Sequence, residues 1–399
     1  MRKQGLLATF LFVSVLGFGQ VDPYLAGRAC MNQKLYDSAV FHLEKALDQN
    51  PGETEILLHL GLSYYELKNY PAARDAFYET EKRRNGMGSF YLAKTEVKLN
   101  HPELALKYLR VHLSSRYKLA ERIILLDEEL STLEGSPGWQ QLWNEKKWFG
   151  SGDKEFQEAI FLNDNGDHLG AINLLNKLEK QGYKRSIVQA EKAAIYTELG
   201  NAKAARSELR SAVKSDVRNL DAVQKLARYQ LEDGASEEAA ISLSRVIRQD
   251  PARFDAYIQR AEVRSHEEDL SGAIEDMELY LTYFPADDEA IYRKGLILFE
   301  HGKYLDAIQS FNHALALDTG KSEYYFARGM TYASTGTNRY ADKDMSMALD
   351  LDPLNGEIWF EKGKLSEKLG NRRGACHCYQ KAFQYGIFKA GEFLDSNCN

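Results

Sequence analysis

Small and large apolar residues recur along this chain with a step of 34 residues. In the clearest unit, small residues stand at Gly329, Ala341 and Ala348, and Pro353 closes the unit. The same positions recur without losing phase over seven consecutive units of the C-terminal half. Each unit has the apolar spacing of two amphipathic helices, and glycines such as Gly302 end the first helix, because glycine adopts the left-handed conformation at little cost. The pattern predicts an array of antiparallel helical hairpins.

A shorter run of the same pattern occupies the N-terminal part of the chain. One unit carries Gly27 and Ala39, the next carries Gly61 and Ala73, and a third, weaker unit follows around Ala105. A single hairpin of this kind cannot bury its apolar face alone, so neighbouring hairpins must stack.

This spacing resembles the tetratricopeptide repeat, which places Trp, Leu-Gly, Tyr, Ala, Phe, Ala and Pro at set positions within 34 residues. The resemblance covers most of the chain, although Trp at the fourth position occurs only as Trp359 and the eighth position is often alanine. It implies an all-α, right-handed superhelical solenoid of about ten helical hairpins in two blocks. A helical insert would separate the blocks, and a capping helix would cover the last hairpin.

The phase of the repeat also predicts where the parts of the chain begin and end. We expect an N-terminal block at 20–113, an insert or joint at 114–151, a C-terminal block at 152–389 and the end of the capping helix at 390–399.

Three of the four tryptophans, Trp139, Trp143 and Trp148, lie in the insert near glycine and proline residues that mark an irregular turn. Two interpretations stay open. The insert is either a packed joint between the two blocks or an aromatic contact surface for a partner.

Residues 1–19 have the layout of a secretory signal peptide. Arg2 and Lys3 precede an apolar stretch, and the small residues Gly17 and Gly19 stand where cleavage before Gln20 would need them. We therefore expect an exported protein, in the periplasm of a Gram-negative bacterium in the first place, and secreted or associated with the outer membrane as alternatives. An uncleaved anchor is the other interpretation of this segment.

Charge and motifs argue against several functions. The net charge of −7 does not favour nucleic-acid binding, which needs a clustered basic surface. No phosphate-binding loop, nucleophile elbow or zinc-protease motif is present in the sequence. We expect no enzyme activity, no cofactor and no metal site.

The cysteines predict a disulfide rather than a metal site. Neighbouring side chains on a helix point about 100° apart, so Cys376, His377 and Cys378 cannot converge on one ion. In an exported protein Cys398 would pair with a cysteine of the preceding helix, with Cys376 as the better partner and Cys378 as the other choice. Cys30 takes a core position and is expected to stay a thiol.

The resemblance implies that the first helices of the hairpins line a concave surface that holds a peptide or a partner helix. The lysine and asparagine of the clamp that binds chaperone tails are absent at the corresponding positions. In their place an apolar stripe crosses three C-terminal units, and it either binds a partner or packs within the solenoid. Its residues are Tyr292, Leu296, Phe299, Phe326, Met330, Phe360 and Lys364.

Together these features predict a non-enzymatic scaffold or adaptor of the bacterial cell envelope that binds an apolar peptide or helix of a partner protein. Association with a membrane would occur only through that partner. The alternative is a glycan- or nutrient-binding accessory protein at the outer membrane, for which exposed tryptophans in the insert would be the sign.

Overall fold

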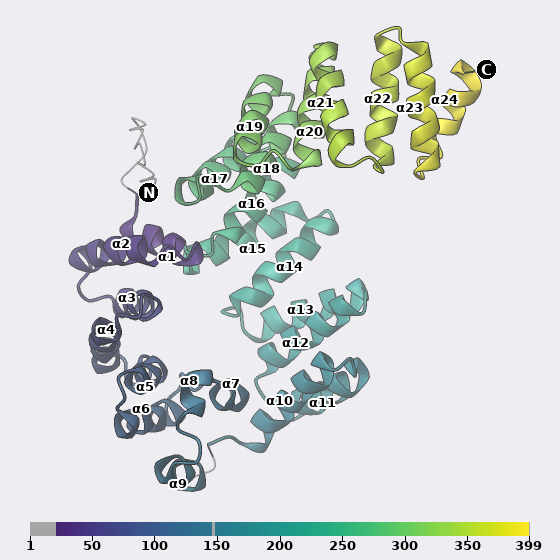
Figure 1. The fold of residues 1–399 in the computed structure, drawn as a ribbon. Helices are drawn as coiled ribbons and strands as arrows, with labels where there is room; N and C mark the ends of the chain where they lie inside the picture. Colours follow the sequence, from purple (N-terminus) through teal and green to yellow (C-terminus); the bar gives the residue numbers. More distant parts are fainter. Residues whose placement is uncertain (1–20, 146–147, 399) are drawn as a thin grey trace. The chain divides into compact units, whose positions relative to one another are not determined.

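The computed structural model of this chain describes residues 21–145 and 148–398, and within these ranges it contains 24 helices and no strand (Figure 1). The predicted signal segment, 1–19, lies outside the described residues. The chain divides into two compact units, one formed by residues up to 119 with 123–146, the other by 120–122 with 147 onward. The expected all-α array of helical hairpins is confirmed.

The first unit contains three hairpins followed by the helices of the insert. In each hairpin the two helices pack against each other, and the hairpins stack in chain order. The helices are α1 (Pro23–Asn32), α2 (Tyr36–Gln49), α3 (Thr54–Glu66), α4 (Tyr70–Arg83), α5 (Ser89–Lys98), α6 (Pro102–Ser114), α7 (Glu121–Leu125), α8 (Glu128–Ser131) and α9 (Pro137–Glu145).

The insert is not a separate body. Its helix α8 packs on α5, and α9 packs on α6, so both extend the N-terminal stack. Buried leucines at Leu130, Leu133 and Leu142 anchor these helices. The expected segment 114–151 therefore belongs largely with the N-terminal block.

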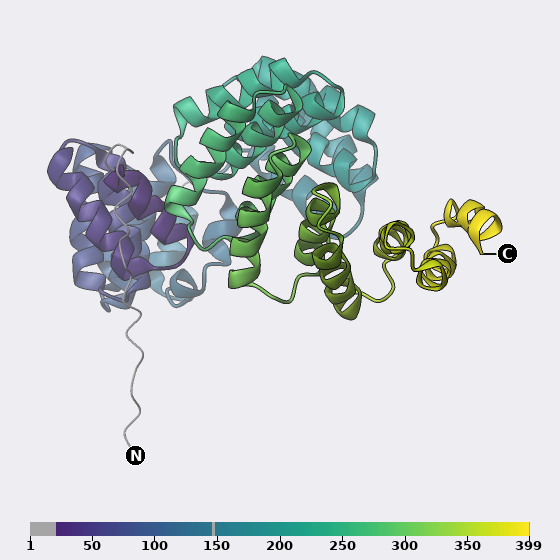
Figure 2. The same cartoon turned by 90° about the horizontal axis from the view of Figure 1, so that it is seen from above.

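The second unit contains seven stacked hairpins and a terminal helix, and Figure 2 shows the last of them, in green and yellow, as successive pairs. The hairpin helices are α10 (Ser151–Asp164), α11 (His168–Lys180), α12 (Arg185–Glu198), α13 (Ala202–Ser215), α14 (Leu220–Glu232), α15 (Ser236–Gln249), α16 (Asp255–His266), α17 (Leu270–Tyr283), α18 (Asp288–Glu300), α19 (Tyr304–Leu317), α20 (Ser322–Ser334), α21 (Asn338–Leu351), α22 (Gly356–Lys368) and α23 (Arg372–Gln384). The terminal helix is α24 (Ala390–Asn397).

Small residues at the eighth position of a unit let the two helices of a hairpin touch. A Cβ added at Gly61 would lie 2.5 Å from the ring of Phe77, and one added at Gly295 would lie 2.6 Å from the ring of Phe311. Both rings are fully buried. The recurring pair of a glycine and an aromatic residue therefore fixes the distance between the helices.

The turn inside each hairpin needs one residue in the left-handed conformation. Gly200 and Gly302 supply it in the second unit, with φ of 69° and 70°. In the first unit the same place is taken by Lys34, Lys68 and Asn100, with φ of 58°, 60° and 62°. A side chain in this conformation is strained, so the N-terminal turns cost more than the glycine turns. One turn of the second unit, at Glu268 with a φ of 61°, is of the same kind.

The last hairpin is closed by α24, which packs on α23. Phe360 and Tyr379 are buried beneath it, and Phe393 of α24 packs against both rings. A disulfide joins Cys376 to Cys398, with an S–S distance of 2.02 Å. The predicted capping helix is present and covers an apolar face that would otherwise meet water.

None of the helices in the described part of the chain has the length and apolar content that crossing a lipid bilayer requires.

Candidate interaction surfaces

The first helices of neighbouring hairpins contact one another directly, as α16 does with α18 and α18 with α20. Their outward sides form a continuous surface, which we call the first-helix face. Five residues of the predicted stripe lie on two adjacent helices of this face, and all five are half-buried. They are Tyr292, Leu296 and Phe299 on α18, and Phe326 and Met330 on α20.

Tyr292, at the start of this stripe, packs against a neighbouring helix. The Tyr292 ring stacks on Tyr324, with centroids 4.6 Å apart, and the Tyr324 hydroxyl donates a hydrogen bond to Asp288 at 2.8 Å. Burial, together with the nearby carboxylates of Glu323 and Glu289, raises the pKa of Tyr292 to about 12. The Tyr292 phenol therefore stays neutral at physiological pH.

The stripe is shorter than the sequence predicted, because Phe360 is a core residue. It is only 4% exposed, and its ring contacts Tyr379 and Phe393 with centroids 5.8 and 5.3 Å away. The ammonium groups of Lys389 and Lys364 lie 4.3 and 5.2 Å from the same ring. The interpretation that the stripe packs within the solenoid holds at this position, since α24 covers it.

Lys364, the last residue of the predicted stripe, does not extend an apolar surface either. Its ammonium group pairs with Glu361 on the same helix at 2.6 Å. The open apolar part of the first-helix face therefore ends at α20.

In the first unit the corresponding face is covered by the chain itself. Lys94 on α5 pairs with Asp127 at 2.8 Å and with Glu129 of α8 at 2.9 Å, and its ammonium lies 5.7 Å from the rings of Tyr65 and Phe90. Phe90 is 6% exposed. The insert therefore covers part of this face in the first unit.

Glu129 is held in its ionised form at this contact. Burial alone would raise the pKa of the Glu129 carboxyl, but the hydrogen bonds and charges of Lys94 and Lys98 outweigh it and lower this pKa to about 2. The carboxylate stays ionised over the whole physiological range, so the contact between α5 and α8 is a permanent ion pair.

The tryptophans of the insert do not form an open aromatic platform. Trp139 and Trp148 are 7% and 9% exposed, and Trp143 is half-buried with its ring 5.7 Å from that of Trp139. The feature that would have favoured glycan binding at the insert is therefore not found among these side chains.

A row of cations, one buried and four partly buried, runs through the second unit and was not recognised in the sequence. A lysine or arginine stands directly before the small eighth residue in five of the seven hairpins. Each extends from a first helix to the second helix of the preceding hairpin, and all five make hydrogen bonds there. The cations are Lys192, Arg260, Lys294, Arg328 and Lys362. Their 34-residue spacing was the signal that could have revealed them.

Two of these cations also bind the second helix of their own hairpin through both carboxylate oxygens. Arg260 holds Asp276 at 2.6 and 2.8 Å, and Arg328 holds Asp344 at 2.7 and 2.8 Å. Both carboxylates are almost fully buried, with 2% and 6% of the side chain exposed. Since these ion pairs join three helices each, their role is to fix how hairpins stack.

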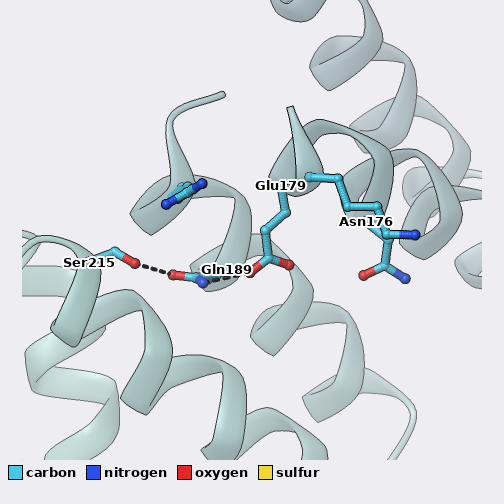
Figure 3. Close-up of a pocket in the computed structure, with 6 residues that line it drawn as sticks. Asn176, Glu179, Gln189 and Ser215 are labelled. Atoms are coloured by element: carbon cyan, nitrogen blue, oxygen red, sulfur yellow. Dashed lines mark hydrogen bonds between the residues drawn. The ribbon is translucent and has the colours of Figure 1, made fainter. Parts of the chain in front are cut away.

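A polar pocket of about 430 Å³ lies where α11, α12 and the end of α13 meet (Figure 3). Within it the Ser215 hydroxyl donates to the Gln189 side-chain oxygen at 2.8 Å, and the Gln189 amide donates to Glu179 at 2.6 Å. The remaining lining residues are Asn176, Lys180 and Arg185. In the ranges that the structure describes, no group of three or more histidine, cysteine or acidic side chains is placed to hold a metal ion.

The chain matches known proteins both by sequence and by fold. The family model of the tetratricopeptide repeat matches residues 24–89, 191–254 and 258–322. A tetratricopeptide repeat protein from Parabacteroides merdae has a similar structure, with 18% identity and a TM-score of 0.53, covering 62% of this chain and 99% of that one.

Two further solved structures are more distant. The C-terminal part of a repeat-containing protein from Cytophaga hutchinsonii has 19% identity, a TM-score of 0.47 and coverage of 60% and 99%. Yeast Tom70 has 13% identity and a TM-score of 0.42, with 94% of each chain covered. The repeat segments and the stacked hairpins together identify this chain as a tetratricopeptide-repeat solenoid.

Proposed function

We propose that this protein is a non-enzymatic scaffold that binds an apolar segment of a partner protein on the first-helix face of α18 and α20. Tetratricopeptide repeats generally mediate protein–protein interactions. The observation that carries the proposal is the group of five half-exposed apolar residues on these two adjacent helices, Tyr292, Leu296, Phe299, Phe326 and Met330.

The surroundings of this stripe fit a partner with one apolar side. Arg293, beside Tyr292, pairs with Glu262 at 2.7 Å and with Glu289 at 3.0 Å, so the charges at this edge are already neutralised. A polar rim of this kind around aromatic and aliphatic anchors is typical of interaction sites for helices and extended peptides. The binding energy would come from the apolar residues and not from salt bridges.

The contrast with the first unit supports the choice of surface. There Asp127 and Glu129 lie on the first-helix face and pair with Lys94. On α18 and α20 the stripe residues are left half-exposed.

We also propose that the protein works outside the cytoplasm, in the periplasm or at another site of the bacterial envelope. Two features support this. Residues 1–19 read as a signal peptide. The disulfide between Cys376 and Cys398 is stable in an oxidising compartment and is rare in the cytosol.

Substitution of half-buried stripe residues tests the proposed surface. In the double variant Phe326→Ser with Met330→Ser, we expect retention of the partner from an envelope extract to fall by more than about tenfold, because buried apolar anchors dominate such interfaces. The matched control is Leu305→Ser on α19, a second helix, where the leucine is 74% exposed and apolar but lies off the first-helix face.

Thermal unfolding of the three proteins is measured in parallel. Equal binding by the double variant and the wild type would contradict the proposal. So would loss of binding that occurs only together with loss of helical structure.

A further inference from the structure

Gln189 has a polar side chain at a position that the five following hairpins fill with an apolar or aromatic one, whereas the preceding hairpin has Glu155 there. In the 34-residue register this fourth position is Val223, Tyr257, Ile291, Tyr325 and Trp359 in the following hairpins. Like those of Val223, Tyr257 and Ile291, the Gln189 side chain is buried, with only 7% of the residue exposed. A buried amide at a core position costs stability unless it is fully hydrogen-bonded, so its presence calls for an explanation.

The space around Gln189 is the polar pocket of about 430 Å³, which is large enough for a small organic molecule (Figure 3). Figure 3 shows Ser215, Gln189 and Glu179 in a continuous row of hydrogen bonds along its wall. Because the amide oxygen and one amide hydrogen are engaged in this row, the Gln189 side chain is held in one orientation. Among the described residues, Glu179 is the acceptor for the Gln189 side-chain amide, which carries two hydrogens.

The charges of the pocket are unbalanced toward positive. Glu179 shares the buried Lys192, at 2.8 Å, with Glu208, which lies 2.7 Å from the same ammonium group, so Lys192 offsets only part of the negative charge of Glu179. Burial alone would raise the pKa of Glu179, but the hydrogen bonds from Lys192 and Gln189 and the charges of Lys192 and Arg185 lower it. Two further cations, Lys180 and Arg185, line the pocket.

Lys180 and Arg185 are exposed, and neither forms an ion pair with a carboxylate in the parts of the chain that the structure describes. They stand beside the amides of Asn176 and Gln189, which are neutral donors. Two unpaired cations and two amides around one cavity suit an oxygen-rich anion, because charge-assisted hydrogen bonds to carboxylate and phosphate are the strongest that such groups make.

We propose that this pocket binds a small anion carrying a carboxylate or phosphate group. Arg185 and Lys180 would neutralise its charge, and the amides of Gln189 and Asn176 would orient it. The site is separate from the stripe on α18 and α20, so it does not depend on the proposed partner. It would give the scaffold a second ligand, a small metabolite, in addition to a protein.

The repeat itself supplies the variant that tests the proposal. Tyrosine stands at this position in α16 (Tyr257) and α20 (Tyr325). We therefore expect the Gln189→Tyr variant to stay folded while its larger side chain fills the pocket. Binding of inorganic phosphate and of citrate to the full chain is measured by calorimetry. We expect the wild type to bind one of them with saturation at one site, and Gln189→Tyr to bind it at least tenfold more weakly.

A second pair of variants separates the site from general charge. Lys180→Ala with Arg185→Ala removes the two exposed cations without touching the core, and we expect the same loss of at least tenfold. The control Lys214→Ala, at the position of Lys180 in the next hairpin, should leave binding unchanged.

The two probes distinguish the kind of anion. Binding of phosphate but not citrate would indicate a phosphorylated ligand, and binding of citrate but not phosphate would indicate a carboxylate. The proposal is overturned if neither probe binds the wild type. It is also overturned if Gln189→Tyr binds as well as the wild type, because the interaction would then be surface charge only.

Discussion

The two blocks of this solenoid join their hairpins in different ways. At the position before the small eighth residue, the N-terminal block has the buried apolar residues Ala26, Leu60 and Leu92. The C-terminal block has a lysine or arginine at the same position in five hairpins. The backbone arrangement is the same, so one repeat can be held together either by apolar contacts or by buried ion pairs.

The two kinds of contact give different properties. Apolar contacts such as those of Leu60 are not directional, and burying such a side chain contributes about 2 kcal/mol. An ion pair such as Arg328 with Asp344 must overcome the desolvation of both charges, so its net contribution is small. Its geometry is directional, however, and Arg328 also binds Asn312 of the preceding hairpin at 2.6 Å. We infer that the ion pairs fix the register between hairpins more than they add stability.

The largest expected effect comes from breaking one buried pair. Asp344→Ala leaves the Arg328 guanidinium, whose side chain is 19% exposed, without its carboxylate. We expect a loss of about 3 kcal/mol in the free energy of unfolding, measured by urea denaturation. The double variant Arg328→Leu with Asp344→Leu removes both charges and should recover most of this loss.

Two comparisons sharpen this test. Asp342→Ala removes the 44% exposed partner of Lys362 and should cost less than about 1 kcal/mol. Leu60→Lys places a cation in the apolar contact of the N-terminal block and should cost about 3 kcal/mol, because the lysine would be buried without a partner. If the double variant is as unstable as Asp344→Ala, the ion pair contributes net stability and the comparison between blocks is wrong.

The N-terminal block should be the more sensitive to acid. His112 is 2% exposed, and burial lowers its pKa to about 4, while its ring Nε2 accepts a hydrogen bond from the Leu119 amide at 3.0 Å. The folded block therefore keeps His112 neutral where the unfolded chain, with a pKa near 6.5, is protonated. The stability from this group is complete above about pH 6.5 and is lost as the pH falls toward 4.

The expected loss for this block at pH 4 is about 3 kcal/mol. Hydrogen exchange of α5 and α6, measured from pH 7 to pH 4, would show it as loss of protection. In His112→Gln the dependence on pH in this range should disappear from the first unit. A wild type that keeps full protection in α6 at pH 4 would contradict the assignment of a neutral, buried histidine.

The ends of the two blocks differ as well, since α8 lies on the first block through ion pairs while α24 is joined to the second by a disulfide. The bridged cysteines are 22 residues apart, for which loop closure predicts about 3 kcal/mol of stabilisation. The disulfide lies at the end of the second stack. We therefore expect its reduction to lower hydrogen-exchange protection in α24 and not in α8. Cys376→Ser should have the same effect without reductant, and equal loosening of both ends would contradict this view.

The smallest effects are expected at the turns. Lys68→Gly should stabilise the first unit by about 1 kcal/mol, because lysine is strained at a φ of 60°. Gly302→Lys should destabilise the second unit by a similar amount. Denaturation midpoints of the two single variants measure both, and a shift in the same direction for both would show that the turn does not limit stability.

The sequence was sufficient to predict the fold because the repeat is one-dimensional. Each glycine opposite an aromatic residue, such as Gly295 with Phe311, reports a local contact that recurs with fixed spacing. The same reasoning failed for Phe360, since its burial depends on α24, which is outside the repeat. It also failed to predict that α8 packs on Lys94, because Glu129 of α8 lies in the insert, outside the 34-residue repeat.

The polar pocket and the row of cations were missed for a different reason. Both consist of departures from the repeat, Gln189 at an apolar position and Arg260 or Arg328 beside a small residue. Residues that differ from the tetratricopeptide pattern do not contribute to its recognition. A comparison of each hairpin with its neighbours, position by position, would have found them.

The central claim is that an apolar segment of a partner binds on α18 and α20. The most direct test is to introduce a photo-reactive benzoylphenylalanine at Met330, or at Leu305 as the control, and to map cross-links in an envelope extract by mass spectrometry. We predict one protein cross-linked from Met330 through a single apolar segment and not from Leu305, with the cross-link lost in Phe326→Ser. Equal cross-linking from both positions, or a cross-link from Met330 that Phe326→Ser leaves unchanged, would contradict the claim.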